Sequence, residues 1–286
     1  MKIGLSTATF FGKVLTEDAL ALIKSFGLGI AEVFLTTFSE YEESFTEELS
    51  KRLNGVEVYS VHSLNNHYEP ELFNQVYRTR NDAEKILDKV LMGGKNLKAR
   101  YYTFHGPSRL KVTEYKLDYK RIGTRVEELC QRAQLYGLDI SFENVSWGFY
   151  NSPGCFQRLK EYAPSLTGCL DIKQAMQAYR SQREIKGGTA LDIEQLDALE
   201  KYTYAYIEDM GNSLVNVHLS DYDGYGKLCS PGKGIFDFKK FFGKLKENGY
   251  NGPMMIELYS GDYSSFDEIT DSINYLQKIL TEGNYE

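Results

Sequence analysis

The segment LVNVHLSD, residues 214–221, decides the predicted fold. Apolar and polar residues alternate along it, and the polar positions before the final aspartate are Asn216, His218 and Ser220. Because successive side chains of a strand point to opposite faces, one face of this strand is apolar and the other is polar. An apolar face covered by helices and a polar face turned into a lumen are typical of a strand in a barrel.

Short strand-like segments of the same kind recur along the chain. The other seven begin at Lys2, Ile30, Val56, Ala99, Leu138, Leu166 and Pro253. Helix-period stretches follow them, and the clearest cover residues 16–27, 70–92, 114–136, 192–210, 235–248 and 265–280. Glycines follow several of these stretches at the expected C-terminal cap position: Gly27, Gly93, Gly137, Gly211 and Gly249.

Eight strand–helix units with short links favour parallel neighbours, so we predict an α/β protein with a single (β/α)8 TIM barrel over residues 1–286. The units take about 36 residues each (286/8), which leaves no remainder for a second domain. A doubly wound open sheet is the competing architecture. It requires a glycine-rich fingerprint after the first strand, and Ser6-Thr7-Ala8-Thr9 is not one.

Composition narrows the classes of protein. Apolar residues make up 42% and charged residues 26%, which excludes a disordered or fibrous chain. No apolar run approaches the ~18–20 residues of a membrane helix. The formal net charge of −7 argues against binding to a nucleic-acid backbone. Four cysteines without a CxxC pair, and an N-terminus without a signal-peptide pattern, predict reduced thiols and a cytoplasmic protein.

Aromatic residues are abundant, at 14% of the chain. The strand phase predicts that Tyr102, Phe104 and Phe142 face outward, where they would pack against the helices.

The same phase places one inward His, Asp or Glu at the C-terminal end of each strand from the third to the eighth. These residues are His62, His105, Glu143, Asp171, His218 and Glu257. TIM barrels build their sites at these strand ends, so we expect the side chains to converge. Buried carboxylates repel one another unless some are protonated or a cation holds them. A divalent cation is the simpler solution.

Glu143, Asp171, His218 and Glu257 form the predicted metal site. Three carboxylates and one imidazole favour Mn²⁺ or Mg²⁺, and leave Zn²⁺, Co²⁺ and Fe²⁺ open. His62 and His105 fit either hydrogen-bonded core histidines or groups that contact a ligand.

The chain resembles the xylose isomerase-like TIM barrel superfamily over essentially its whole length. The resemblance rests on Glu143-Asn144, Asp171, His218-Leu219-Ser220-Asp221, the loop at 231–238 and Glu257. This superfamily contains sugar phosphate isomerases and epimerases, inosose dehydratases and the AP endonucleases of family 2. In its ketose epimerases, the positions that match Glu143, Asp171, His218 and Glu257 bind one divalent metal ion.

The resemblance implies a divalent-metal-dependent isomerase or epimerase of a sugar, sugar phosphate or related polyol, with Glu143 and Glu257 as the acid/base pair. Such a reaction removes a weakly acidic C–H proton beside a carbonyl, and a metal ion stabilises the developing charge. His62, His105 and Gln174 are expected to contact the substrate. Gln174 stands where the family often has His; its amide binds hydroxyls but is a poor metal ligand.

Three other functions remain open. A dehydratase-like lyase of the same fold would share the first proton abstraction. An AP-endonuclease-like DNA-repair nuclease is suggested by His62 and His105, but residues 222–231 lack the His of that family's multi-metal site. A non-catalytic sugar-binding barrel is suggested by Gln174. We expect a small carbohydrate as the partner, and we expect neither nucleic acid nor a membrane. The sequence carries no signal for an oligomeric state.

Overall fold

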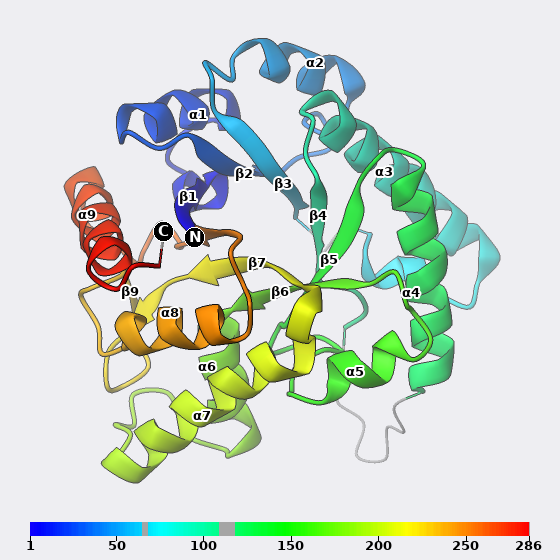
Figure 1. The fold of residues 1–286 in the computed structure, drawn as a ribbon. Coiled ribbons are helices and arrows are strands. Elements are labelled where there is room, and N and C mark those ends of the chain that lie inside the picture. Colours follow the sequence, from blue (N-terminus) through cyan, green and yellow to red (C-terminus); the bar gives the residue numbers. More distant parts are fainter. Residues whose placement is uncertain (65–67, 109–117, 286) are drawn as a thin grey trace.

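A closed barrel of eight parallel strands forms the centre of the molecule (Figure 1). The computed structural model describes residues 1–64, 68–108 and 118–285. The barrel strands are β1 (Lys2–Ser6), β2 (Ile30–Leu35), β3 (Glu57–Ser63), β4 (Tyr101–Phe104), β5 (Asp139–Glu143), β6 (Thr167–Asp171), β7 (Leu214–Leu219) and β10 (Pro253–Ile256). They follow chain order, and β10 closes the barrel against β1. The predicted (β/α)8 fold is confirmed.

The strand register brings the predicted inward residues to one end of the barrel. Asp171 lies opposite His218 across β6 and β7, and His218 lies opposite Met255 on β10. Glu257 comes directly after β10, and its backbone N–H donates to Leu219 O at 3.0 Å. These side chains therefore enter the lumen at the C-terminal strand ends, as expected for this fold.

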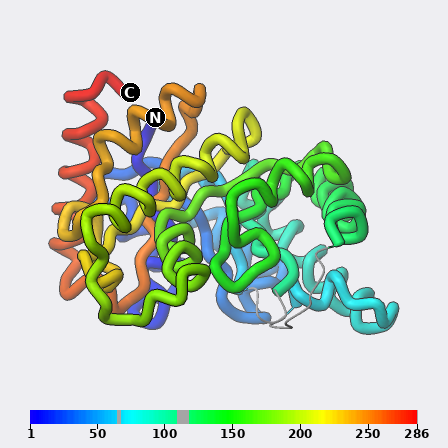
Figure 2. Tube along the Cα trace, turned by 90° about the horizontal axis from the view of Figure 1, so that it is seen from below, coloured from blue at the N-terminus to red at the C-terminus, as the bar shows by residue number. Residues whose placement is uncertain are grey.

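Helices cover the outside of the barrel (Figures 1 and 2). They are α1 (Thr16–Ser25), α2 (Glu43–Lys51), α3 (Tyr77–Asn96), α4 (Tyr119–Gln134), α5 (Cys155–Lys160), α6 (Ile172–Gln182), α7 (Ile193–Met210), α8 (Phe238–Glu247) and α9 (Phe266–Glu282). A small hairpin of β8 (Asp221–Tyr222) and β9 (Leu228–Cys229) follows β7. The chain ends lie side by side (Figure 2), and the Met1 ammonium donates to Tyr285 O at 2.7 Å.

Most of the predicted glycine caps are confirmed. Gly27, Gly137 and Gly249 follow α1, α4 and α8 with positive φ angles of 78°, 82° and 79°, a conformation that glycine adopts without steric cost. Gly211 is the C-terminal cap of α7.

The predicted helix over 70–92 is wrong in its bounds. Residues Pro70–Phe73 form a 3-10 turn and α3 begins only at Tyr77, because the Asn74 side chain accepts from Val76 N at 2.8 Å and makes a local turn. Gly93 is not a cap, since α3 continues to Asn96. A Cβ at this position would crowd a side chain of α2, so Gly93 permits close helix packing instead.

The outward aromatic side chains lie in the hydrophobic core. Tyr102, Phe104 and Phe142 are fully buried. The ring centroids of Phe104 and Phe142 lie 5.5 Å apart, and those of Phe142 and Tyr150 lie 5.8 Å apart. Across the described ranges, no helix is both long and apolar enough to span a membrane.

Candidate metal centre

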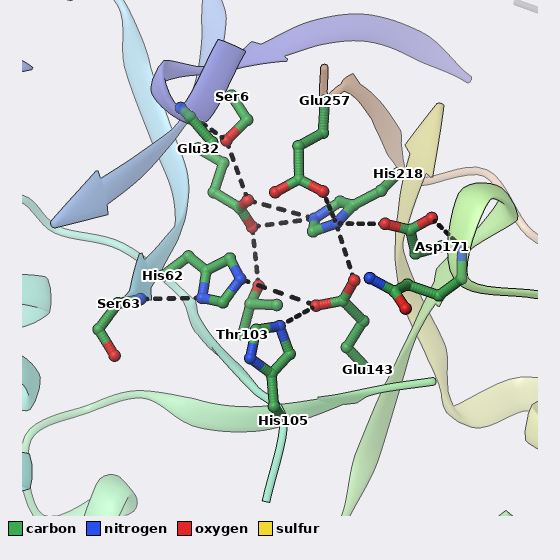
Figure 3. Close-up of polar contacts among 12 residues, drawn as sticks. Ser6, Glu32, His62, Ser63, Thr103, His105, Glu143, Asp171, His218 and Glu257 are labelled. Atoms are coloured by element: carbon green, nitrogen blue, oxygen red, sulfur yellow. Dashed lines mark hydrogen bonds and ion pairs between the residues drawn. The ribbon is translucent and has the colours of Figure 1, made fainter. Parts of the chain in front are cut away.

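The four predicted metal ligands meet at the C-terminal end of the barrel (Figure 3). Glu143 ends β5, Asp171 ends β6, His218 comes from β7 and Glu257 follows β10. One ligand atom from each lies within 4.8 Å of the others. His218 Nδ1 is 3.1 Å from Glu257 Oε2, 3.5 Å from Glu143 Oε1 and 4.0 Å from Asp171 Oδ2. This group of four could hold a metal ion.

Three buried ligand atoms of this group are incompletely satisfied. Glu143 Oε2, Asp171 Oδ2 and His218 Nδ1 have ion-pair contacts but no hydrogen-bond partner among the described residues. Burial and the charges of Glu143 and Glu257 outweigh Lys173 and raise the pKa of Asp171 to about 7. A divalent cation would satisfy these atoms and relieve the repulsion, so the residues fit such an ion.

Hydrogen bonds to the neighbouring backbone leave one carboxylate oxygen of Asp171 available to this centre. Its Oδ1 accepts from Gln174 N at 2.9 Å and caps α6. The Asn144 side chain clamps the Asp171 backbone, because it donates to Asp171 O at 3.0 Å and accepts from Asp171 N at 2.7 Å. Only Oδ2 is then left to face the other ligands.

Glu32 of β2 is a functional candidate that the sequence analysis missed. Its buried carboxylate lies beside the four ligands (Figure 3) and accepts from Ser6, Ser60, Thr103, Asn216 and His218. Its contact with His218 Nε2 is 3.2 Å long. This partner fixes the imidazole and leaves Nδ1 turned towards the other three ligands.

A signal for Glu32 was present in the sequence. In IAEVFL, residues 30–35, apolar residues flank Glu32 on both sides, so the alternation that identified the other six places it inward as well. Burial raises the pKa of Glu32, but the charge of His218 and its hydrogen bond outweigh burial. The pKa of Glu32 therefore lies below its ordinary value.

His62 and His105 form a second group with Glu143. His105 Nε2 is 2.7 Å from Glu143 Oε2, and His62 Nε2 is 3.7 Å from the same oxygen. Ser63 N donates to His62 Nδ1 at 2.8 Å, which places the proton of the neutral ring on Nε2. Burial and the neighbouring His105 lower the pKa of His62 to about 4, so this ring is neutral near pH 7.

Gln174 lies at the same site with its carbonyl oxygen already occupied. Its Oε1 accepts from both the backbone N–H and the hydroxyl of Ser146, each at 3.0 Å. The amide NH2 group is the part of the side chain that remains as a donor. Gln174 lines the cavity described next, and its contact with substrate stays a prediction, as do those of His62 and His105.

A cavity of about 340 Å³ opens above these residues. His62, His105, Glu143 and Glu257 supply polar surface, and the aromatic lining consists of Phe11, Phe34, Trp147 and Tyr259. Trp147 therefore forms part of the pocket wall. Apolar walls with a few convergent polar groups are typical of small-molecule sites.

The sequence matches one protein-family model, described as xylose isomerase-like TIM barrel, over residues 20–279. The chain belongs to this family. The resemblance inferred from the strand-end residues is therefore confirmed. A comparison with curated proteins gave no significant match.

Several solved structures share the fold of this chain over almost its whole length. A D-tagatose 3-epimerase-like protein has a TM-score of 0.76 and 19% identity, and the alignment covers 99% of this chain and 98% of that one. The zinc-bound IolI protein has a TM-score of 0.67 and 17% identity, and the alignment covers 99% of this chain and 98% of that one. The probable 3-DHS dehydratase AsbF from Bacillus anthracis has a TM-score of 0.68 and 11% identity, and the alignment covers 98% of this chain and 99% of that one. At these identities, the similarity shows the fold.

Lys173 is a second residue that the sequence analysis missed. Only 2% of its surface is exposed, although it lies in the first turn of α6, where a lysine is normally solvated. Its Nζ lies 3.1 Å from Glu257 Oε2 and 3.2 Å from Asp171 Oδ2. These two carboxylates outweigh the effect of burial and raise the pKa of Lys173 well above its ordinary value. In this chain, two of the four predicted ligands therefore have a buried ammonium group beside them.

Asp221 holds the loop after β7. Its carboxylate accepts from four backbone N–H groups, those of Tyr222, Gly232, Gly234 and Phe236. Gly234 is required here because a Cβ would overlap the Asp221 carboxylate and the Tyr222 carbonyl. The Pro-Gly-Lys-Gly segment of the family resemblance is therefore a structural loop anchored by Asp221.

Proposed function

We propose that this protein is a divalent-metal-dependent isomerase or epimerase of a sugar, sugar phosphate or related polyol. The observation that carries the proposal is the convergence of Glu143, Asp171, His218 and Glu257 within 4.8 Å at a small-molecule cavity. Mn²⁺ or Mg²⁺ suits this donor set best, and Zn²⁺, Co²⁺ and Fe²⁺ are also compatible.

In this proposal, Glu143 and Glu257 act as the acid/base pair. Burial raises the pKa of each, but His105 outweighs it for Glu143, and Lys173 with His218 outweighs it for Glu257. Both groups are therefore carboxylates near pH 7, the form that accepts a proton. A bound divalent ion would supply electrostatic stabilisation of the charge that develops on substrate oxygens. Both carboxylates line the cavity, as an acid/base pair requires.

The remaining lining residues suit a polyol. In the proposed complex, His62, His105 and Gln174 hold hydroxyl groups through their ring and amide nitrogens. The rings of Phe11, Phe34 and Trp147 would pack against the C–H faces of the sugar. The cavity of about 340 Å³ lies at the small end of the ~300–1,000 Å³ range of ligand pockets, which favours a single sugar unit.

The test combines metal binding with product analysis. Purified protein is titrated with Mn²⁺ by calorimetry and then incubated with a panel of ketoses and aldoses in D2O under NMR observation. We expect one bound ion and deuterium at a carbon beside the carbonyl, with no loss of water. Glu257→Gln should weaken Mn²⁺ binding and abolish deuterium exchange. Glu247→Gln, on the exposed face of α8, should change neither.

The possible outcomes separate the alternatives. Absence of Mn²⁺ and Mg²⁺ binding by the wild-type protein would refute the proposal. Loss of water from the substrate would assign a lyase reaction in place of epimerisation. A bound ion with no exchange on any sugar of the panel would indicate a non-catalytic binding protein.

A further inference from the structure

Lys173 places a fixed positive charge among the proposed metal ligands. Its ammonium makes ion pairs with Asp171 Oδ2 and Glu257 Oε2, and lies 4.3 Å from the ring centroid of Tyr259. A lysine this deeply buried requires partners for its charge. These contacts supply them, so the side chain has a defined position within the site.

This position conflicts with a metal ion. Asp171 has only Oδ2 to offer, since Oδ1 caps α6, and Oδ2 is the oxygen that the Lys173 ammonium contacts at 3.2 Å. A divalent ion bound to this oxygen at the usual ~2.0–2.6 Å would therefore lie next to Nζ. Two cations that share one carboxylate oxygen repel each other strongly in a buried site.

The cavity offers the lysine another place. Lys173 and Tyr259 both line it, so the buried lysine borders the cavity. The four-carbon stem is flexible, and the ammonium carries three hydrogen-bond donors. In the cavity, these donors would meet the hydroxyl, carbonyl or anionic oxygens of a bound substrate.

We propose that the Lys173 ammonium occupies the cation position of the metal-free site, and that this side chain turns into the cavity when a divalent ion takes its place, there donating hydrogen bonds to the substrate. This inference rests on the proposed function for its substrate part. It adds a substrate-contacting residue and makes metal loading and substrate binding interdependent.

The first measurement uses Mn²⁺ alone and needs no activity. Lys173→Met should bind Mn²⁺ about tenfold more tightly than the wild type in calorimetric titration, because the opposing charge is removed. Lys13→Met is the matched control: Lys13 is exposed and lies against the Tyr263 ring, so its loss should leave the affinity unchanged. Equal affinity of Lys173→Met and wild type would overturn the displacement.

Folding of the variant is checked independently. Lys173→Met removes the ammonium partner of Asp171 and Glu257, so the metal-free variant should melt at a lower temperature than the wild type, and Mn²⁺ should restore more of its stability. If Lys173→Met does not fold, Lys173→Gln takes its place in the same titration. A crystal structure with Mn²⁺ should show Nζ beyond ~4 Å, the ion-pair limit, from Asp171 Oδ2. A retained ion pair would refute the inference.

The substrate contact has its own readout. With any sugar that the wild type converts at saturating Mn²⁺, Lys173→Met should raise KM about tenfold, and Lys13→Met should leave KM unchanged. An unchanged KM in Lys173→Met would overturn the substrate contact. Failure of every variant to bind Mn²⁺ would instead refute the proposed function, so the two failures are distinguishable.

Discussion

Replacing Glu32 by Gln tests whether the buried charge beside the centre organises the barrel. The carboxylate receives its shortest hydrogen bonds from Ser60 and Thr103, both at 2.7 Å, and a further contact from His218 at 3.2 Å. Gln keeps the shape of the side chain. Its amide oxygen can replace Oε2, and its NH2 group can face Ser6 Oγ, which is able to accept.

The expected cost follows from what the amide cannot replace. A hydrogen bond to a charged group is worth ~1.5–3 kcal/mol, against ~1 kcal/mol for a neutral one. Removing one member of a buried ion pair costs ~3–5 kcal/mol. Because burying the wild-type carboxylate also costs free energy, we expect the free energy of unfolding of Glu32→Gln to fall by about 3 kcal/mol at pH 7. Orientation of His218 is lost as well, so Mn²⁺ should bind ~10–100-fold more weakly.

The assay is urea unfolding followed by circular dichroism, with Glu57→Gln as control because Glu57 is exposed on the neighbouring strand.

The folded pKa of Glu32 lies below its ordinary value of 4.5. Its contribution to the free energy of unfolding is therefore present above pH 4.5 and is lost as pH falls through the folded pKa. The difference between Glu32→Gln and wild type should therefore shrink in acid. Surface substitutions usually change the free energy of unfolding by no more than about ±0.5 kcal/mol. If Glu32→Gln differs from wild type by no more than this at pH 7, the account is refuted.

Two further predictions concern Glu69 and the loop after β7. Burial raises the pKa of Glu69 from 4.5 to about 7, so its stabilising contribution is complete below pH 4.5 and is lost as pH rises through 7. Relative to Glu69→Gln, wild type should lose about 3 kcal/mol of unfolding free energy between pH 4 and pH 8; a pH-independent difference would contradict this. Gly234→Ala should lower the unfolding free energy by ~1–3 kcal/mol through overlap with Asp221. Gly224→Ala should melt like wild type, because, apart from the adjacent residues in the chain, no described atom lies within 4 Å of the added methyl group.

The sequence was sufficient for the barrel because the decisive signal is local. Alternation in residues 214–221 and in the other seven segments depends only on neighbouring residues. The same alternation selected Glu143, Asp171, His218 and Glu257, and parallel strands then bring their C-terminal ends to one edge. Glu32 obeys the same rule, but it stands at the third residue of β2 and not at the C-terminal end of its strand.

Other features were beyond the reach of local patterns. The helix over 70–92 was misplaced because a single Asn74 side chain turns the backbone before Tyr77. Gly93 has the sequence context of a helix cap, yet it lies within α3 and permits close packing. Asp221, three residues after His218, accepts hydrogen bonds from backbone N–H groups of the loop after β7, and the sequence around it carries no signal for this role.

The barrel and the inward carboxylates and imidazoles could be predicted from residue order and period, and the family from the resemblance of the strand-end motifs. Only the tertiary structure decided what surrounds them. Glu32 meets His218 across 186 residues, and Lys173 meets Glu257 across 84 residues. Such contacts exist only once the barrel closes, and burial then makes each unpaired charge costly. That cost is why a lysine in a helix turn, which sequence alone places in solvent, lies between the carboxylates of the candidate metal centre.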